Sequence, residues 1–408
     1  MPDLKVEIAF DLAANGLGDF FTLNDTTKGV LDNATYKLAG NILQDVTAYT
    51  RSITTRRGRS RQLDRFTAGA ATIRLDNRAR TFDPLAGTAL TPYAGQIVPR
   101  KEVKITVDSV DVFTGQVEDW DLVYELSGDS VAEASCSDGF ALIANQTLAA
   151  GTAAAQLTGA RISTYLNALG WPTAQTSIAT GQATLLADTI GVNTNGLQYL
   201  QKVEASENGG AALFVNKAGL ITFRDRSQAQ TFSGVAFGTG GIPFQAIEVQ
   251  YGTETLYTEA TVTRSNGTST IGTATVTNDA AATSYGYTTY TLDTLLDSDG
   301  KASELASWLS GKYSTPQYVI RSLTVNLQGI SSAAASQVLG LEVADIVQVT
   351  WTPNGVGTAL SQYVGIDEIR HEAVPGRYLV TFSMSAQQVG FILDDAIFGV
   401  LDNDILGL

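Results

Sequence analysis

Short segments that alternate apolar and polar side chains are the strongest constraint on the fold of this 408-residue chain. They occur in two stretches, one at 46–138 and one after a Gly-rich turn at 238–241. Alternation with a period of two places one set of side chains on each face of a strand, and Gly, Asp and Pro turns separate the segments. Several short strands at close spacing predict a β-barrel or β-sandwich in each stretch.

The pattern changes to helical periodicity between the two stretches. Four apolar residues recur at i, i+3, i+4 and i+7, and Gly170-Trp171-Pro172 then ends the helix. The four residues are Ile162, Tyr165, Leu166 and Leu169. A second helix is expected at about 197–208, followed by a hairpin with strands at 213–215 and 220–223. This part of the chain is predicted to be a small α+β domain.

Strands resume after this domain, with one helix among them. The helix carries Leu305, Trp308 and Leu309 on one face. The expected later strands lie at 319–327, 346–351, 363–369 and 378–383. The stretch 265–289 is rich in Ser, Thr, Ala and Gly, and is predicted to be either a flexible loop or an exposed hairpin.

One internal repeat links the two β-rich stretches. The segment 113–118, with its returning strand at 131–135, parallels 363–368 with its returning strand at 379–383. Each copy has a Gly-containing strand, a polar turn and a second strand. The repeat therefore predicts two related β domains that flank the α+β insert.

A second repeat lies near the two termini. Residues 21–33 recur as 391–403 and share a Phe, a Leu, an Asp and the run Gly-Val-Leu-Asp-Asn in one register. We interpret both copies as docking elements for other subunits, and the alternative is that each caps its own barrel as local core. The apolar residues expected at this interface are Phe21, Leu23, Val30, Leu31, Phe391, Leu393, Val400 and Leu401.

These features predict a mainly β chain with two β-barrel domains around an α+β insert. The expected first and last segments are an N-terminal docking segment at 1–45 and a C-terminal apolar docking segment at 387–408. The β-barrel domains are expected at 46–139 and 236–386, and the α+β insert at 140–235.

Arginines are concentrated at 51–65 of an otherwise acidic chain, which has 26 Lys and Arg against 41 Asp and Glu. Further basic residues follow at Arg74, Arg78, Arg80, Arg100 and Lys101. No aromatic residue separates the arginines at 51–65, so the segment lacks the stacking platform of single-strand binders. It is either a contact for an acidic partner or nucleic acid, or it pairs with Asp64, Asp76 and Asp83 or with a neighbouring subunit. We favour the neighbouring subunit. The expected interface arginines are Arg56, Arg57, Arg59, Arg61 and Arg65.

The composition is unfavourable for catalysis. The chain has one histidine, His371, and one cysteine, Cys136, although most hydrolytic and metal sites need several such residues. The carboxylates of Glu118, Asp119 and Asp121 suggest a glycosidase pair, but no further residue marks a sugar site. We therefore predict no catalytic residue, no metal site and no cofactor. No signal peptide and no run of about 18 apolar residues is present, so membrane insertion is not expected.

Three segments resemble minor tail proteins of long-tailed, siphovirus-type phages, especially those of actinobacteria. The first is RGRSRQLDRFTAGAATIRLDNRARTFDP at 57–84, and the others lie at 209–226 and 285–316. The two β domains around an insert also resemble tail hub proteins. The paired barrels of those proteins are similar to the tail-tube fold and form a three-fold ring with pseudo-six-fold symmetry.

The resemblance implies a structural, non-enzymatic role in the virion, at the tail tip, after synthesis in the host cytoplasm. It implies a homo-oligomer, with a trimer favoured, that joins the tail tube or distal tail ring to tip and fibre proteins. The tape measure protein is a further expected partner. DNA would pass through the ring without specific binding, and an acidic lumen would repel it.

Three alternatives remain at this stage. A six-fold distal tail ring would differ in stoichiometry. A receptor-binding or carbohydrate-binding tail protein would use exposed aromatics, for which Tyr285, Tyr287 and Tyr290 are the candidates. A cell-wall hydrolase would need a catalytic constellation such as an acidic pair.

Overall fold

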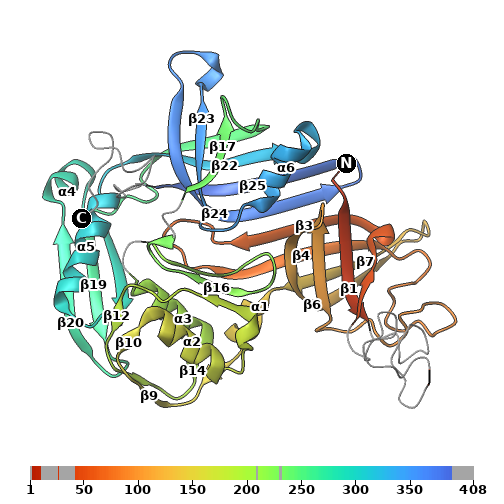
Figure 1. Ribbon diagram of the computed structural model, residues 1–408, viewed down its shortest axis with the longest axis horizontal. Helices are drawn as coiled ribbons and strands as arrows, with labels where there is room; N and C mark the ends of the chain where they lie inside the picture. Colours follow the sequence, from red (N-terminus) through yellow and green to blue (C-terminus); the bar gives the residue numbers. More distant parts are fainter. Residues whose placement is uncertain (1, 11–25, 27–41, 208–209, 229–231, 388–408) are drawn as a thin grey trace.

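One sheet of thirteen strands runs through the molecule, and the smaller elements pack around it (Figure 1). The computed structural model describes residues 2–10, 26, 42–207, 210–228 and 232–387. The strands of this sheet are β1 (Leu4–Phe10), β2 (Ile42–Asp45), β3 (Thr50–Gly58), β4 (Thr67–Asp76), β5 (Glu102–Val107), β6 (Val110–Tyr124), β7 (Ser130–Ser137), β17 (Phe232–Gly238), β18 (Ala246–Gly252), β22 (Gln317–Asn326), β23 (Ile346–Trp351), β24 (Leu360–Val374) and β25 (Arg377–Ala386). Their hydrogen-bonded order is β18-β22-β25-β24-β3-β4-β7-β6-β5-β1-β2, with β23 joined to β24 and β17 off this path.

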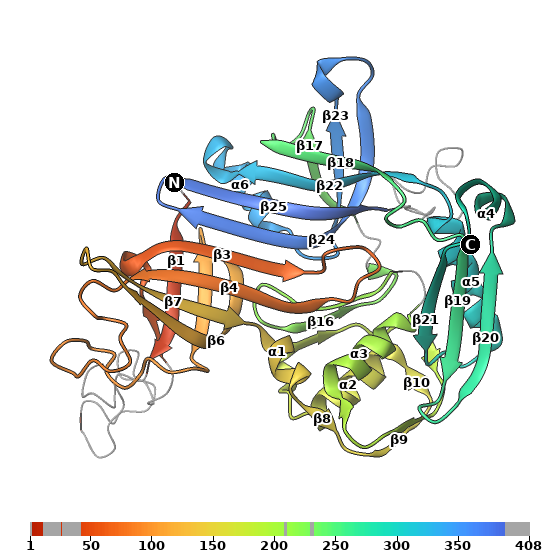
Figure 2. The same ribbon diagram turned by 180° about the vertical axis from the view of Figure 1, so that it is seen from behind.

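The expectation of two separate β-barrels is wrong for the part of the chain that the structure describes, although the mainly β class is confirmed. The first residues of β24 pair with β23, but Glu368–Ala373 pair antiparallel with Ile53–Gly58 of β3. Figure 2 shows these strands side by side in one layer. Because this pairing carries the sheet of one half into the other, neither half closes on itself.

The two halves of the sheet nevertheless have the same strand order. The order β1-β5-β6-β7-β4-β3 in the first half corresponds to β17-β23-β24-β25-β22-β18 in the second. In each half a 15-residue strand forms a hairpin with the next strand, and the register shifts by one residue, at Glu118 in β6 and at Asp367 in β24. These hairpins contain the repeat at 113–135 and 363–383. One difference is that β17 runs parallel to β23, whereas β1 runs antiparallel to β5.

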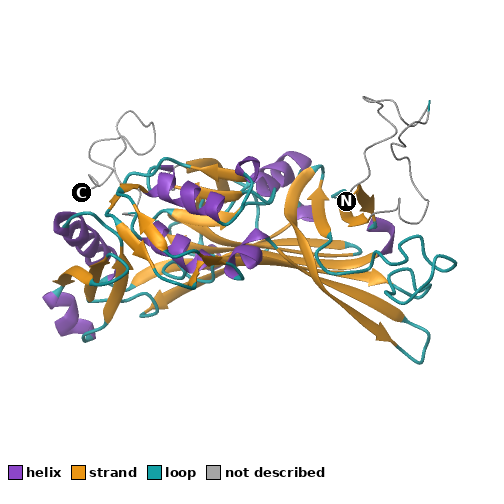
Figure 3. Ribbon diagram, turned by 90° about the horizontal axis from the view of Figure 1, so that it is seen from below, coloured by secondary structure: helices purple, strands orange, loops and turns teal. Residues whose placement is uncertain are grey.

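The junction between the halves requires a glycine. Gly58 has a φ of +122°, and a Cβ placed on it would lie 2.1 Å from the Asp367 carbonyl oxygen. Any other residue would therefore separate β3 from β24 at this point. One face of the joined strands is buried in a single hydrophobic core that extends through both halves and the insert. Figure 3 shows helices along one side of the long strands.

The segment expected to be the α+β insert contains three helices and several short strands. Its helices are α1 (Gly139–Ala144), α2 (Thr158–Ala168) and α3 (Gly196–Ala205). Asn195 caps α3, since its side chain accepts a hydrogen bond from the Gln198 N–H at 3.0 Å. The strands are β8 (Thr147–Leu148), β9 (Gly151–Ala153), β10 (Gln156–Leu157), β11 (Thr176–Ile178), β12 (Thr184–Leu185), β13 (Asp188–Ile190), β14 (Thr194–Asn195) and the predicted hairpin, β15 (Ala212–Val215) with β16 (Ile221–Arg224).

A separate three-stranded sheet lies between β18 and β22 in the sequence. It consists of β19 (Glu259–Ser265), β20 (Thr270–Thr277) and β21 (Thr289–Thr294), and has its own small core. Two helices belong to it, α4 (Asp279–Tyr285) and α5 (Asp299–Tyr313). The hairpin alternative for 265–289 is therefore correct for its first part, and a helix follows. The remaining described elements are α6 (Ser332–Gly340) and the 3₁₀ turns η2 (Thr47–Tyr49), η3 (Thr173–Gln175), η5 (Leu327–Gly329) and η6 (Pro353–Gly355).

His371 lies in the buried face of the junction, opposite Thr55 of β3. Its Nδ1 atom is 3.2 Å from the Tyr378 hydroxyl oxygen. Burial, together with the positive charges of Arg57 and Lys217, lowers the pKa of His371 to about 3. The histidine is thus neutral in the folded protein at every pH at which the protein is expected to work.

Acidification should therefore weaken the junction through His371. The unfolded chain binds a proton at this residue below about pH 6.5, but the folded chain does not. The contribution of His371 is complete above pH 6.5 and is lost as the pH falls toward 3. Burial raises the pKa of Asp138 to about 7, which acts in the opposite direction, so the total stability curve does not isolate His371.

Comparison with His371→Leu isolates the histidine, because Asp138 is common to both proteins. We expect the free energy of unfolding of His371→Leu, relative to the natural chain, to improve by about 2 kcal/mol between pH 7 and pH 5. Urea denaturation at the two pH values measures this difference. An unchanged difference would contradict a neutral, buried His371.

Candidate assembly surface at the sheet junction

Arg57 joins three parts of the chain. Its guanidinium is buried, and Nη1 donates to Glu342 Oε1 at 2.6 Å. Nε donates to the Val112 carbonyl at 3.1 Å, and Nη1 also reaches the Val215 carbonyl at 3.5 Å. Val112 belongs to β6 in the first half, Val215 to the insert, and Glu342 follows α6 in the second half. One side chain therefore ties both halves and the insert together.

The Glu342 carboxylate has further donors around it. The backbone N–H groups of Lys217 and Val343 each donate to it at 2.9 Å. Burial opposes its charged form, but Arg57 and these N–H groups outweigh burial and hold the pKa of Glu342 below its usual range. Lys217 Nζ donates to the Leu339 and Gly340 carbonyls at the end of α6, at 2.8 and 2.7 Å. Arg57 and Glu342 thus each have hydrogen-bond partners besides one another, as a buried ion pair requires.

Two more arginines of the predicted cluster pair with β24. Arg59 Nε lies 2.8 Å from Asp367 Oδ1, and its guanidinium stacks 4.6 Å above the centre of the Phe66 ring. Arg56 Nε lies 2.6 Å from Glu368 Oε2 on the opposite face of the sheet. Both contacts cross from the first half of the sheet to the second, next to the shifted register at Asp367.

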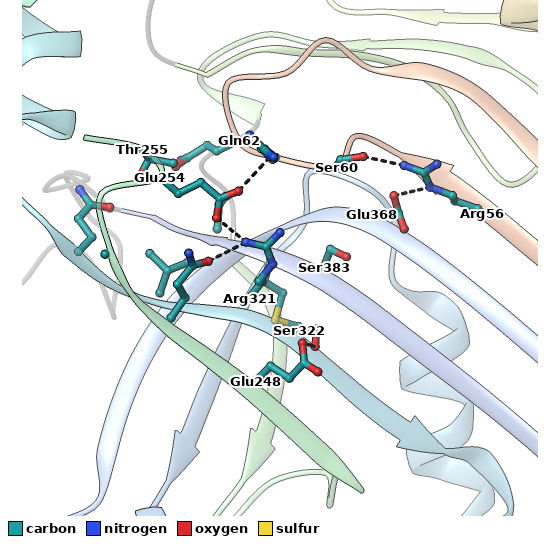
Figure 4. Close-up of a pocket in the computed structure, with 17 residues that line it drawn as sticks. Arg56, Ser60, Gln62, Glu248, Glu254, Thr255, Arg321, Ser322, Glu368 and Ser383 are labelled. Carbon is teal, nitrogen blue, oxygen red and sulfur yellow. Dashed lines mark hydrogen bonds and ion pairs between the residues drawn. The ribbon is translucent and has the colours of Figure 1, made fainter. Parts of the chain in front are cut away.

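A pocket of about 270 Å³ lies beside Arg56 (Figure 4). Within it, Glu254 binds two arginines: Arg61 Nε at 3.0 Å, and Arg321, which also donates to Gln250 Oε1 at 2.6 Å. Burial raises the pKa of Glu254, but hydrogen bonds from Arg321 outweigh this and keep it low. Positive and negative groups balance in the pocket lining, so its arrangement suits a structural joint between strands.

The predicted arginine cluster therefore pairs largely within the chain. Four of its members bind carboxylates of the second half, and Arg65 is exposed. Two of the three acids expected as partners do bind arginines of the basic segment, since Asp76 pairs with Arg51 and Arg78, and Asp83 pairs with Arg80. No ion pair of the third acid, Asp64, is found among the described residues. Contact of the cluster with a neighbouring subunit stays a prediction, and it now concerns its exposed members.

The terminal repeats cannot be placed in this framework. All eight of their predicted interface residues lie outside the described residues: Phe21, Leu23, Val30, Leu31, Phe391, Leu393, Val400 and Leu401. Their role as docking elements stays a prediction from the sequence.

The three carboxylates considered as a glycosidase pair, and the single cysteine, are not arranged as a catalytic site in the described residues. Glu118 pairs with Arg100 at 3.0 Å, whereas Asp119 and Asp121 are exposed on β6. Burial raises the pKa of the Cys136 thiol well above its usual range. Among the described residues, no group of three or more His, Cys, Asp or Glu could hold a metal ion. In the same residues, no helix is long and apolar enough to cross a membrane.

Sequence reasoning missed the carboxylates that hold the arginines. Glu342 and Glu254 lie in unremarkable loops, and nothing in their local sequence links them to β3. Asp367 and Glu368 could have been identified from the sequence, because they belong to the repeated segment at 363–383. Recognising that segment as a strand that pairs with 53–58 would have identified two of the four partners.

Removing Arg57 should destabilise the whole sheet. In Arg57→Met the Glu342 carboxylate keeps its burial but loses its charged partner, so we expect a loss of about 3–5 kcal/mol in the free energy of unfolding. Urea denaturation measures this loss. Arg56→Met is the matched control, because its pair with Glu368 is half exposed and should contribute no more than about 1 kcal/mol.

The double variant Arg57→Met, Glu342→Gln should recover part of the loss, because it removes the buried unpaired charge. Equal effects of Arg57→Met and Arg56→Met would contradict a special role for Arg57.

Solved structures of phage tail proteins have the same fold, although no protein-family model and no curated protein matches the chain. The 43 kDa tail protein of prophage MuSo2 from Shewanella oneidensis is 13% identical, with a TM-score of 0.58 over 95% of this chain and 97% of that one. A tail protein from Neisseria meningitidis MC58 is 9% identical, with a TM-score of 0.58 over 86% and 95%. Prophage tail protein gp18 from Listeria monocytogenes EGD-e is 10% identical, with a TM-score of 0.49 over 93% and 94%. The first two similarities establish that this chain has a phage tail protein fold.

Proposed function

We propose that the chain is a structural component of a phage tail tip, a hub ring that connects the tail tube or distal tail ring to tip and fibre proteins. The observation that carries this proposal is a duplicated sheet whose whole architecture matches a prophage tail protein over 95% of the chain. The match includes the insert and both halves, so it concerns the entire arrangement. The chain's contacts are those of a rigid structural element, and catalysis plays no part in the proposed role.

The duplication favours a ring of three copies. Each chain contributes two sheet units with one strand order, so three chains would supply six equivalent units. Such a ring would match the six-fold symmetry of a tail tube. Neighbouring sheet units would all contact one another with the same strand-pairing geometry. The sequence resemblance to minor tail proteins of siphovirus-type phages points in the same direction.

The proposed location sets the expected partners. In the virion the ring would contact the distal tail ring, the tape measure protein and the tip or fibre proteins, and it would surround the channel through which DNA leaves. A formal net charge of −15 repels phosphate, so DNA would pass without specific binding. No insertion of this chain into a membrane is proposed.

One observation favours a second role in receptor or carbohydrate binding. The side chains of Tyr285 and Tyr287 are 50% and 73% exposed at the end of α4. Neighbouring exposed tyrosines suit the stacking of sugar rings. This role would be added to the ring, since the two tyrosines belong to the separate sheet of β19, β20 and β21.

The mass of the protein in solution tests the ring. Light scattering should give three times the chain mass of 43.1 kDa. Six times the chain mass would favour a six-fold distal tail ring instead. A stable monomer that is also absent from assembled tails would contradict both forms of the proposal.

Deletion of 389–408 tests the proposed docking role of the C-terminal repeat. We expect the truncated chain to fold and to be lost from tails, because the deletion removes the apolar residues of that copy. Circular dichroism reports folding, and mass spectrometry of purified tails reports incorporation. A full-length chain with Asp402→Ala and Asn403→Ala is the control, because it keeps the apolar residues of the repeat. Normal incorporation of the truncated chain into tails would contradict the docking role.

A further inference from the structure

Several strand edges of the large sheet have no backbone partner strand among the described residues, and two of them correspond to the two sides of the internal junction. One is the outer edge of β18, which pairs only with β22. The other is the outer edge of the distal part of β6, Asp119–Tyr124, which continues beyond the end of its pairing with β5 at Gln116. Free strand edges are templates for pairing with another strand.

The two open edges correspond in position to the two strands that pair at the internal junction, β24 and β3. Asp119–Tyr124 follows the register shift in β6 as Glu368–Ala373 follows the shift in β24, and each segment pairs with the next strand of its hairpin. Strand β18 likewise holds the place of β3, because β22 and β4 occupy equivalent positions beside them. The sequence agrees, since Ile53-Thr-Thr-Arg-Arg-Gly58 aligns without gaps on Ile247-Glu-Val-Gln-Tyr-Gly252.

We propose that β18 of one copy pairs antiparallel with Asp119–Tyr124 of β6 in the next copy, in the register of the internal junction of β3 and β24. Transferring that register places Gly252 opposite Asp119, as Gly58 lies opposite Glu368. The following pairs are Tyr251 with Trp120, Gln250 with Asp121, Val249 with Leu122, Glu248 with Val123, and Ile247 with Tyr124.

The side chains match in this register. Trp120, Leu122, Ile247 and Val249 are partly buried and pack at the two ends of the main core. Tyr124 and Tyr251 are 54% and 69% exposed, so each edge carries a large aromatic side chain in contact with water. The pairing would put all six on one face, continuing the core from one copy into the next.

The charges also match. Asp119 takes the place of Glu368, and Gln250 takes the place of Arg56, to which Glu368 is bound in the internal junction. The Gln250 side chain already accepts a hydrogen bond from Arg321 at 2.6 Å. The acidic end of the β6 edge would therefore meet a positively charged neighbour.

The occupant of each edge must be a second copy. Six strands separate β18 from β6 in the sheet, so the two edges lie roughly 30 Å apart in one chain, at about 4.8 Å per strand. A contact between two different edges leaves one of each free, and repetition produces a head-to-tail ring. Closure of that ring rests on the proposed function, whereas the strand pairing has its own test.

Disulfide trapping tests the pairing. In the double variant Val123→Cys, Glu248→Cys the new thiols face each other across the contact, so oxidation should give dimers and higher multimers in denaturing, non-reducing gels. The edges are too far apart for a bond within one chain, and the natural Cys136 is only 5% exposed. Each single variant should give no multimers. Asp119→Cys with Glu248→Cys is the matched control, because it is four residues out of register.

Leu122→Lys gives an independent measurement. It places a charge in the apolar contact, and we expect it to shift the mass in solution toward the monomer with an unchanged circular dichroism spectrum. A ring without the Val123–Glu248 bond, or equal trapping by the out-of-register pair, would overturn the pairing and leave the proposed function standing. A disulfide-trapped ring that never enters tails would support the strand pairing and overturn the proposed function. A monomer that is absent from tails would overturn the strand pairing and the proposed function.

Discussion

The buried ion pair of Arg57 and Glu342 is the contact on which the rest of the structure depends. A guanidinium in the core is costly unless every donor finds an acceptor, and its acceptors come from β6, from the insert and from the loop after α6. The two halves and the insert can satisfy Arg57 only in one relative placement. The ion pair therefore acts mainly on specificity, because apolar packing alone would tolerate small shifts of one half against the other.

Sequence alone gives the elements well and their pairing poorly. Alternation identified most strands, and the Gly-Trp-Pro stop placed the end of the helix at 158–168 within two residues. Alternation does not say which distant strand lies alongside, so the extension of β24 onto β3 was missed and barrels were expected. The same limit applies to the arginines. Their spacing puts Arg56 and Arg57 on opposite faces, but only the tertiary fold decides that Arg57 is buried.

The internal junction and the proposed contact between copies use one backbone geometry with different side chains. Arg57, Thr55 and His371 make the internal junction polar, and the insert and the loop after α6 supply acceptors for Arg57. Tyr251, Val249 and Leu122 stand in the equivalent places at the free edges. The difference has a physical reason. Segments of one chain need no binding free energy to meet, whereas a contact between copies must offset the entropy of association with buried apolar area.

The open edges of β18 and of Asp119–Tyr124 in β6 carry exposed tyrosines, so each edge could also pair with its own copy in a second chain. The charged side chains on each edge oppose such symmetric pairings. Two β6 edges in antiparallel contact centred on Trp120 would place Asp119 of each copy opposite Asp121 of the other. Two β18 edges in antiparallel contact centred on Glu248 would place the two Glu248 side chains opposite each other. Like charges directly opposite on neighbouring strands are destabilising, so both symmetric contacts are penalised. The proposed unlike contact places Asp119 beside Gln250 and its partner Arg321. In that proposal the charges would favour a directional contact between copies over a symmetric one.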